Sequence, residues 1–483
     1  MNIKNKAVAG VKWVLISNAL AQLFQLFFML VLARLISPRE VGLLGMVTVF
    51  TGFAASFSEL GFRAVLIQRK VINEKHYSSV FWLNFGMGVL LFSIMYLISG
   101  SIGVFYHEPT LMPLTRLVAV TYIINSFGIV TQAKLNRTMN FRRLALIDTT
   151  AVLVSGGVAI TMASRGFGVW SLAWSIVVSA CVTQFLYLFK AEWRPSRVFS
   201  LTAIKELLGF SGNVFAYNLY NYWVRNSDNL LIGKYLGSVE LGVYSRAYSL
   251  MLMPLNFISS AFSQVMFPAL SLIQDDKTKV KEIYLKTIAS IALITFPMML
   301  GLWVVSDVFV RVMLGVKWLG VIPFLEVFSL LGLVQSVATT TGWIYLSQGR
   351  ADLQLRFMVV ASAMIIGSII IGILLGSSMA VAVSYAFTSG ILLFYPCFAI
   401  PGRLINMTVA EVLRKLSGIL ACAIFMAAVV WYVGRLLPES LNVLVKLIIQ
   451  VLAGGLIYLV LIEVFTIEAY GNIKQELFRR RTV

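Results

Sequence analysis

Long apolar stretches, each about twenty residues, follow one another through nearly the whole chain with only short polar segments between them. A helix that crosses the hydrocarbon core of a bilayer needs about 20 mainly apolar residues. A soluble domain carries about 25% charged residues, whereas this chain has 12% charged and 59% hydrophobic residues. The pattern predicts an all-α integral membrane protein with no soluble domain large enough to hold an enzyme active site.

A window of about 19 residues divides the chain into about fourteen transmembrane helices, with ends that are less certain than their number. The predicted spans are residues 11–32, 41–60, 80–98, 114–130, 144–162, 169–189, 207–235, 243–266, 288–305, 321–345, 357–375, 379–400, 416–433 and 441–465.

The placement of Lys and Arg gives a separate test of this count, because cytoplasmic segments collect basic residues. With the N-terminus inside, 28 of the 39 basic residues fall in predicted inner segments, so we expect both termini to be cytoplasmic. The net charge of +19 is spread over every inner segment and forms no single patch. We therefore expect anionic membrane lipids as its partners, and no nucleic acid.

The cysteine and histidine residues do not form a metal-binding or disulfide pattern. Cys181, Cys397 and Cys422 lie inside predicted spans, while His76 and His107 lie in loops on opposite sides of the membrane. We expect no metal and no cofactor.

The chain repeats itself at a fixed offset of 200 residues. The segment LVLARLISPREVGLL is followed 200 residues later by LLIGKYLGSVELGVY. The matched pairs are Asn18 with Asn218, Leu30 with Leu230, Arg34 with Lys234, Glu40 with Glu240 and Gly42 with Gly242. The first and seventh predicted spans both begin on the cytoplasmic side, so the repeat is parallel, as in transporters with two equivalent halves. We expect a six-helix lobe in residues 1–203, a second in 204–402, a central cavity between them, and two further helices with a cytoplasmic tail in 403–483.

The densest polar cluster at predicted membrane depth lies in the seventh span, NVFAYNLYNYWVRNSDNLLIG. Polar groups at that depth are costly and mark functional sites. Arg225 and Asp228 share a helix face, so they could form a structural ion pair, or Arg225 could bind a phosphate through two hydrogen bonds. The candidate substrate-binding residues are Arg225, Asp228, Asn229, Asn218, Asn221, Tyr220 and Tyr222.

Three acidic residues, Glu59, Asp148 and Glu326, are candidates for ion coupling. Glu59 and Asp148 lie near span ends, where they could instead reach the cytoplasmic surface. Glu326 precedes the polar run QSVATTTGWIY, which could line a cavity or equally suit tight helix packing. No catalytic residue is predicted.

Several segments together resemble the polysaccharide-transporter branch of the multidrug/oligosaccharidyl-lipid/polysaccharide exporter superfamily. They are RNSDNLLIGKYLGSVELGVYSRAYSL, FPALS, SELGFRAVLIQRK and TTTGWIYLSQGRADL. Within that branch, the chain is most similar to bacterial flippases for exopolysaccharide, O-antigen or teichuronic-type repeat units, and the similarity covers essentially its whole length.

The resemblance implies that the chain moves an undecaprenyl-pyrophosphate-linked oligosaccharide across the bacterial cytoplasmic (inner) membrane by alternating access. It implies that Arg225 meets the pyrophosphate or an acidic sugar, that the asparagines satisfy sugar hydroxyls, and that Tyr220 and Tyr222 pack against sugar rings. A coupling ion, either proton or sodium, and a polysaccharide polymerase with its export machinery would be further partners.

Two other classes of function are alternatives. A multidrug or lipid II-type exporter would share the layout, but drug exporters typically carry an acidic residue in the first helix and lipid II flippases an Arg. Here no Asp or Glu precedes Glu40, and Lys12 is the last charge before Arg34. A membrane-embedded polymerase or glycosyltransferase usually needs a long outer loop, whereas the predicted outer loop 376–378 has three residues. The sequence therefore favours transport over catalysis.

Overall fold

The computed structural model describes residues 20–59, 62, 66, 69, 72–138, 140–189, 193–467 and 470–471, apart from the side chains of 58–59, 206–218, 260–261 and 264. Every regular element in these ranges is a helix, so the predicted all-α fold is confirmed.

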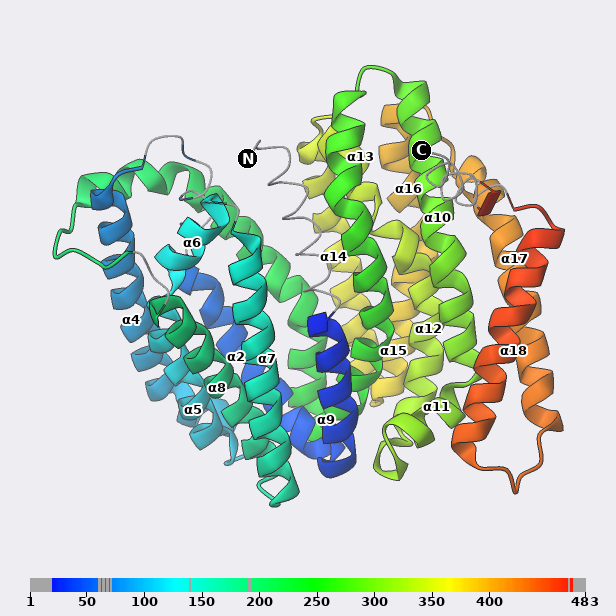
Figure 1. Ribbon diagram of the computed structural model, residues 1–483, viewed down its shortest axis with the longest axis horizontal. Helices are drawn as coiled ribbons and strands as arrows, with labels where there is room; N and C mark the ends of the chain where they lie inside the picture. Colours follow the sequence, from blue (N-terminus) through cyan, green and yellow to red (C-terminus); the bar gives the residue numbers. More distant parts are fainter. Residues whose placement is uncertain are drawn as a thin grey trace. The chain divides into compact units, whose positions relative to one another are not determined.

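The chain divides into two compact units, residues 1–242 and 243–483, with the boundary inside the long helix α9 (Figure 1). The first unit holds the helix Leu20–Leu35, α2 (Pro38–Glu59), α4 (Glu74–Tyr106), α5 (Leu111–Ser126), α6 (Ile129–Arg137), α7 (Phe141–Ser164), α8 (Val169–Phe189) and the first part of α9 (Leu201–Leu272). The second holds the rest of α9, α10 (Lys277–Val304), α11 (Ser306–Met313), η1 (Val316–Trp318), α12 (Val321–Ala338), α13 (Thr341–Ser347), α14 (Ala351–Leu374), α15 (Ser378–Phe387), η2 (Thr388–Leu392), α16 (Phe394–Gly402), η3 (Arg403–Ile405), α17 (Val409–Leu436) and α18 (Val443–Val464). The lobe boundaries expected from the repeat stay a prediction.

Ten helices among the described residues are long and apolar enough to cross a membrane, or eleven when α5 and α6, bent by 50°, count as one span. The first predicted span, 11–32, overlaps the shorter helix Leu20–Leu35, and its residues 11–19 lie outside the described residues. The seventh and eighth both lie in α9, which is broken at Gly237 (φ 89°). The predicted count of fourteen is therefore not confirmed, and it stays a prediction.

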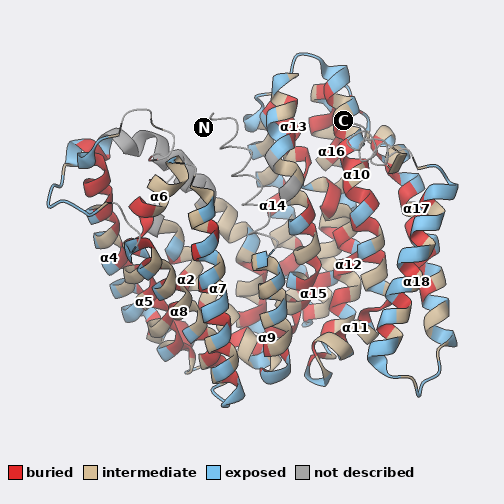
Figure 2. Cartoon of the chain, viewed as in Figure 1, coloured by how far each residue is buried: buried red, intermediate tan, exposed pale blue. Residues whose placement is uncertain are grey.

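Large apolar side chains cover the outside of the helices. Leu97 is 79% exposed, Leu374 80% and Val464 69%, and Figure 2 shows exposed residues along the length of α17 and α18. Such surfaces are unfavourable in water but suit contact with lipid. Because lipid offers no hydrogen bonds, the backbone can satisfy its polar groups at this depth only within helices. The chain is a multi-pass membrane protein.

The core of the second unit lies where α10, α17 and α18 pack together. The Tyr458 hydroxyl of α18 donates a hydrogen bond to the Leu293 carbonyl of α10 over 2.9 Å. Gly454 of α18 has no side chain, and an added Cβ would lie 3.0 Å from Val430 of α17. Small residues of this kind let membrane helices approach closely. Gly454 thus packs α18 on α17, and Tyr458 attaches α18 to α10.

The first turn of α2 crosses the segment after Gly237 at backbone contact. A Cβ added to Gly42 would lie 1.7 Å from the Ser238 carbonyl oxygen, and one added to Gly242 would lie 1.9 Å from the Pro38 carbonyl oxygen. The contact is reciprocal at the repeat offset, because Pro38 corresponds to Ser238 and Gly42 to Gly242. This symmetry supports the internal repeat that the sequence predicts.

The two copies of the repeat also break at equivalent places. Helix Leu20–Leu35 ends before Ser37, and the matching break in α9 falls at Gly237. Ser37 donates to Glu40 Oε2 from its backbone nitrogen over 2.7 Å and from its hydroxyl over 2.8 Å. This arrangement satisfies an amide at the start of α2, as in other helix caps.

Replacing Gly42 by Ala should strongly destabilise the protein, since the new methyl group meets backbone that cannot rotate away. Overpacking typically costs about 1–3 kcal/mol, and a contact this short should reach or exceed the upper end. Gly157→Ala is the matched control, because an added Cβ there meets nothing within 4 Å. The measurement is the melting temperature of the detergent-solubilised protein. Equal melting temperatures for the two variants would contradict the close crossing.

Candidate functional site

The polar segment of α9 is attached to α2 through Tyr222. The Tyr222 hydroxyl lies 3.0 Å from the Thr48 carbonyl oxygen and 2.7 Å from that of Val49. Gly52 makes room for this ring, because an added Cβ would lie 2.5 Å from the Tyr222 hydroxyl. The hydroxyl of Tyr222 is therefore used to position α9 on α2.

The next residue strengthens the same contact. The Trp223 ring packs against that of Phe53 with centroids 4.7 Å apart, and such aromatic pairs stabilise by about 0.5–1.5 kcal/mol beyond their buried area. The amide of Asn226 donates to the Tyr222 carbonyl over 2.8 Å. Sequence analysis did not single out Trp223, since an apolar aromatic residue in a span carries no functional signal.

Asn221, Arg225 and Asn229 form the polar stripe of α9. They are four residues apart, so they lie on one face of the helix. Arg225 is exposed, and Asn221 and Asn229 are half-buried. Among the described side chains, none forms a hydrogen bond or ion pair with Arg225. The Asn229 Oδ1 is buried without a hydrogen-bond partner among the described groups, so the stripe holds polar groups that a ligand could satisfy.

Asp228 lies in a different environment from Arg225. It is buried, with 8% of its surface exposed, and its Oδ1 accepts a hydrogen bond from the Asn229 backbone nitrogen over 2.7 Å. Arg225 is therefore an exposed cation and Asp228 a buried carboxylate, and no ion pair joins the two among the described contacts. Tyr220 is half-buried.

The remaining predicted residues are spread over both units. The side chains of Asn218 and Glu59, and the whole of Asn18, lie outside the described residues. Asp148 is exposed near the start of α7 in the first unit. Glu326 of α12, in the second unit, is half-buried and accepts a hydrogen bond from Ser306 over 3.0 Å.

A second polar group of residues lies in the second unit and was only partly foreseen. The hydroxyls of Tyr248 and Tyr385 lie 3.3 Å apart, and the amide of Gln335 donates to Tyr385 over 3.1 Å. Tyr385 lies in the last turn of α15, three residues before the π-helical turn η2 begins at Thr388, and such a distortion frequently occurs at functional sites. Gln335 belongs to the polar run noted in the sequence, whereas the two tyrosines gave no signal because their contact joins residues 137 positions apart.

The sequence matches a family of polysaccharide biosynthesis proteins and several of its named relatives. The model of a family described as "Polysaccharide biosynthesis protein" matches residues 31–323. The lipopolysaccharide biosynthesis protein WzxC of Escherichia coli (strain K12) is 30% identical over 77% of this chain and 76% of its own length. The teichuronic acid biosynthesis protein TuaB of Bacillus subtilis (strain 168) is 28% identical over 99% of both chains.

Solved structures show the same fold. The lipid II flippase MurJ in an inward closed conformation matches with a TM-score of 0.77 at 14% identity, over 93% of this chain and 98% of that one. An inward-facing multidrug resistance MATE family transporter matches with a TM-score of 0.63 at 16% identity, over 80% and 94%. At these identities the similarity identifies the fold alone.

Tyr222→Phe should lower the melting temperature of the solubilised protein, because it removes a hydroxyl bonded to α2. Such a hydrogen bond contributes about 0.5–1.5 kcal/mol. Tyr220→Phe is the control, since the described contacts give the Tyr220 hydroxyl no hydrogen bond. If Tyr220→Phe destabilised the protein as much as Tyr222→Phe, the positioning role of Tyr222 would be wrong.

Proposed function

The chain belongs to the polysaccharide biosynthesis protein family, and we propose that it is a flippase for lipid-linked polysaccharide repeat units in the bacterial inner membrane. The family match over residues 31–323 carries this proposal, together with relatives named for lipopolysaccharide, teichuronic acid and succinoglycan biosynthesis. The chain is a transporter and not an enzyme. Its substrate would be an undecaprenyl-pyrophosphate-linked oligosaccharide, carried from the inner to the outer leaflet by alternating access.

The polar stripe of α9 is the part of the first unit that suits such a headgroup. An exposed Arg with no partner among the described side chains can bind a pyrophosphate or an acidic sugar through two parallel hydrogen bonds. Asn221 and Asn229 on the same face supply both donors and acceptors for sugar hydroxyls. Asn218 and Tyr220 would extend this contact. Tyr222 would act indirectly by positioning α9, and Asp228 would support the helix from its buried side.

Energy for transport would come from a proton or sodium ion, by analogy with the superfamily. Glu326 is a candidate for that role, because it is a half-buried carboxylate with one described donor, Ser306. Glu59 and Asp148 are the other candidates. A polysaccharide polymerase and its export machinery would receive the flipped repeat units.

Arg225→Gln should impair transport without impairing folding, because Arg225 is exposed and has no described partner. Hydrogen bonds to a charged group contribute about 1.5–3 kcal/mol, so affinity for the lipid-linked unit should fall about tenfold to a hundredfold. Arg225→Lys keeps the charge but loses the planar guanidinium group. Its affinity for the lipid-linked unit should lie between those of the unchanged protein and Arg225→Gln. The measurement is the share of lipid-linked repeat units left in the inner leaflet, normalised to the amount of protein in the membrane.

Two further variants interpret that result. Arg356→Gln removes another exposed Arg and should transport normally. Arg225→Gln combined with Asp228→Asn removes both charges while retaining hydrogen-bonding groups. If this double variant accumulated and exported polymer normally, Arg225 would have no role in binding an anion.

Both termini should be cytoplasmic, because the distribution of 28 of the 39 basic residues requires an even number of spans. Fusions of alkaline phosphatase and green fluorescent protein to the C-terminus and to the loops 375–377 and 437–442 test this. Phosphatase should be active only in the two loops, and fluorescence should appear only at the C-terminus. An active C-terminal phosphatase would refute the even count.

A further inference from the structure

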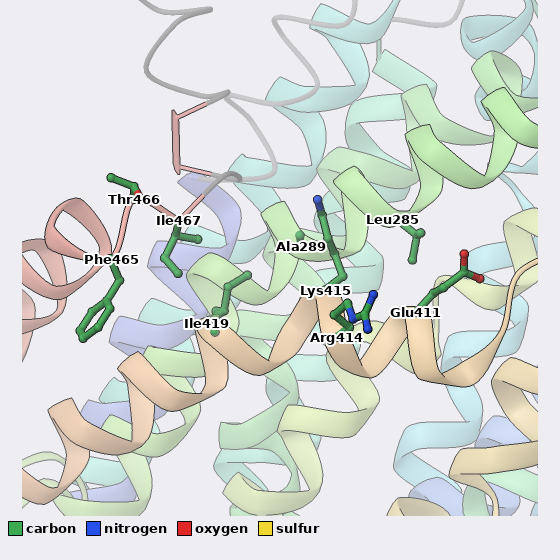
Figure 3. A pocket seen from close by; sticks show the side chains of 10 residues that line it. Leu285, Ala289, Glu411, Arg414, Lys415, Ile419, Phe465, Thr466 and Ile467 are labelled. Carbon is green, nitrogen blue, oxygen red and sulfur yellow. The ribbon is translucent and has the colours of Figure 1, made fainter.

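A cavity of about 450 Å³ lies in the second unit between α10, α17 and the turn after α18. Its size falls in the range of small-ligand sites, about 300–1,000 Å³. Its lining residues are Leu285, Ala289, Glu411, Arg414, Lys415, Gly418, Ile419, Phe465, Thr466 and Ile467. Figure 3 shows Arg414 and Lys415 next to each other on α17, with Ile419, Ile467 and Phe465 to one side. The cavity therefore combines a basic edge with an apolar wall.

The acids beside this edge, Glu411 and Glu282, each have a lysine partner of their own. Glu411 Oε1 is paired with Lys281 over 2.9 Å, and its Oε2 accepts from the Thr408 backbone nitrogen over 2.7 Å in a capping box. Glu282 of α10 is paired with Lys286 over 2.6 Å. Among the described side chains, none bonds to the exposed guanidinium of Arg414. Arg414 thus has donors available for an anion, and Lys415, which has an interaction of its own within the protein, lines the cavity next to it.

The apolar wall is built by a tight turn at the end of α18. Thr466 has a left-handed backbone (φ 45°), and the Ile467 amide donates to the Ile462 carbonyl over 3.1 Å, as in a Schellman cap. The turn brings Ile467 against α17, where an added Cβ on Gly418 would lie 3.3 Å from the Ile467 side chain. Gly418 therefore leaves space beside the basic edge.

The cavity lies where three apolar helices end. The starts of α10 and α17 and the end of α18 lie at one end of the second unit (Figure 1). All three helices qualify as membrane spans, so their ends meet the headgroup region. On the topology predicted from the basic residues, this is the cytoplasmic surface. Basic pockets between membrane helices at that surface are suited to anionic lipid headgroups.

We propose that this cavity binds the phosphate headgroup of an anionic phospholipid, with Arg414 and Lys415 contacting the phosphate and the apolar wall contacting the start of the acyl chains. The chemistry recognised is a phosphate attached to a hydrocarbon chain. The bound lipid would hold the last two helices against α10. The site goes beyond the proposed flippase activity and does not depend on it.

Native mass spectrometry of the full chain in detergent, titrated with dioleoylphosphatidylglycerol, tests the site. Arg414→Gln with Lys415→Gln should weaken binding of the tightest lipid about thirtyfold, since each basic residue near a lipid surface contributes a roughly fivefold gain. Arg414→Gln alone, at an exposed position, should weaken it about fivefold and keeps the test valid if the double variant folds poorly. Lys277→Gln with Lys279→Gln is the matched control, because it removes two exposed charges from the start of α10 outside the cavity.

The site is supported if the cavity variants lose affinity, the control variant keeps it, and dioleoylphosphatidylcholine binds much more weakly than phosphatidylglycerol. Equal losses in the cavity and control variants would overturn it in favour of a diffuse basic surface. Equal binding of the two phospholipids would overturn recognition of an anionic headgroup and would show that the cavity binds only the acyl chains. Displacement of phosphatidylglycerol by equimolar undecaprenyl pyrophosphate, abolished in the cavity variants, would overturn the phospholipid assignment and assign the site to the polyprenyl substrate.

Discussion

The whole structure depends on the requirement that backbone polar groups inside a bilayer find their partners within the protein. Helices satisfy it, and hydroxyl side chains then bond to the carbonyls of their own helices. The Thr51 hydroxyl donates to the Val47 carbonyl over 3.0 Å, and that of Thr295 to the Ile291 carbonyl over 3.0 Å. Polar groups with no partner among the described residues are costly at this depth. Within the described residues, Arg225 and the Asn229 Oδ1 are two such groups on one face of α9.

The helical layout could be predicted because the length of an apolar run reflects bilayer thickness directly. Predicted span 169–189 matches α8 and 441–465 contains α18. The bend of 50° between α5 and α6 could not be predicted, since no proline interrupts residues 114–137. Gly128 lies at the break, and a Cβ added there would lie 1.9 Å from the Gln184 side chain of α8, a contact that the sequence does not show. The sequence shows Gly42 and Gly242 only as a matched pair in the repeat. It does not show that the two backbone segments cross in contact.

The sequence predicts the candidate site as one helix segment, and that assignment stays a prediction. The contacts of its residues could be described only from the packing. Spacing places Arg225 and Asp228 on one face, yet Arg225 is exposed and Asp228 is buried, a difference that spacing alone does not give. Tyr220 and Tyr222 are chemically identical, and only contact with α2 distinguishes them. The cavity beside Arg414 was not foreseen, since it joins residues of α10, α17 and the turn after α18 that are far apart in the chain.

The reciprocal contact between Gly42 and Gly242 is the arrangement that two identical chains make across a two-fold axis, where each surface meets its own copy. In a true dimer, every polar residue would appear twice. In a single chain the two copies of a repeat can carry different residues, and here they do. At the offset of 200 residues, Asn221, Arg225 and Asn229 correspond to Ala21, Gln25 and Met29. The framework is symmetric while the polar stripe is one-sided, which suits a cargo whose two ends, a charged sugar headgroup and a hydrocarbon tail, are themselves unlike.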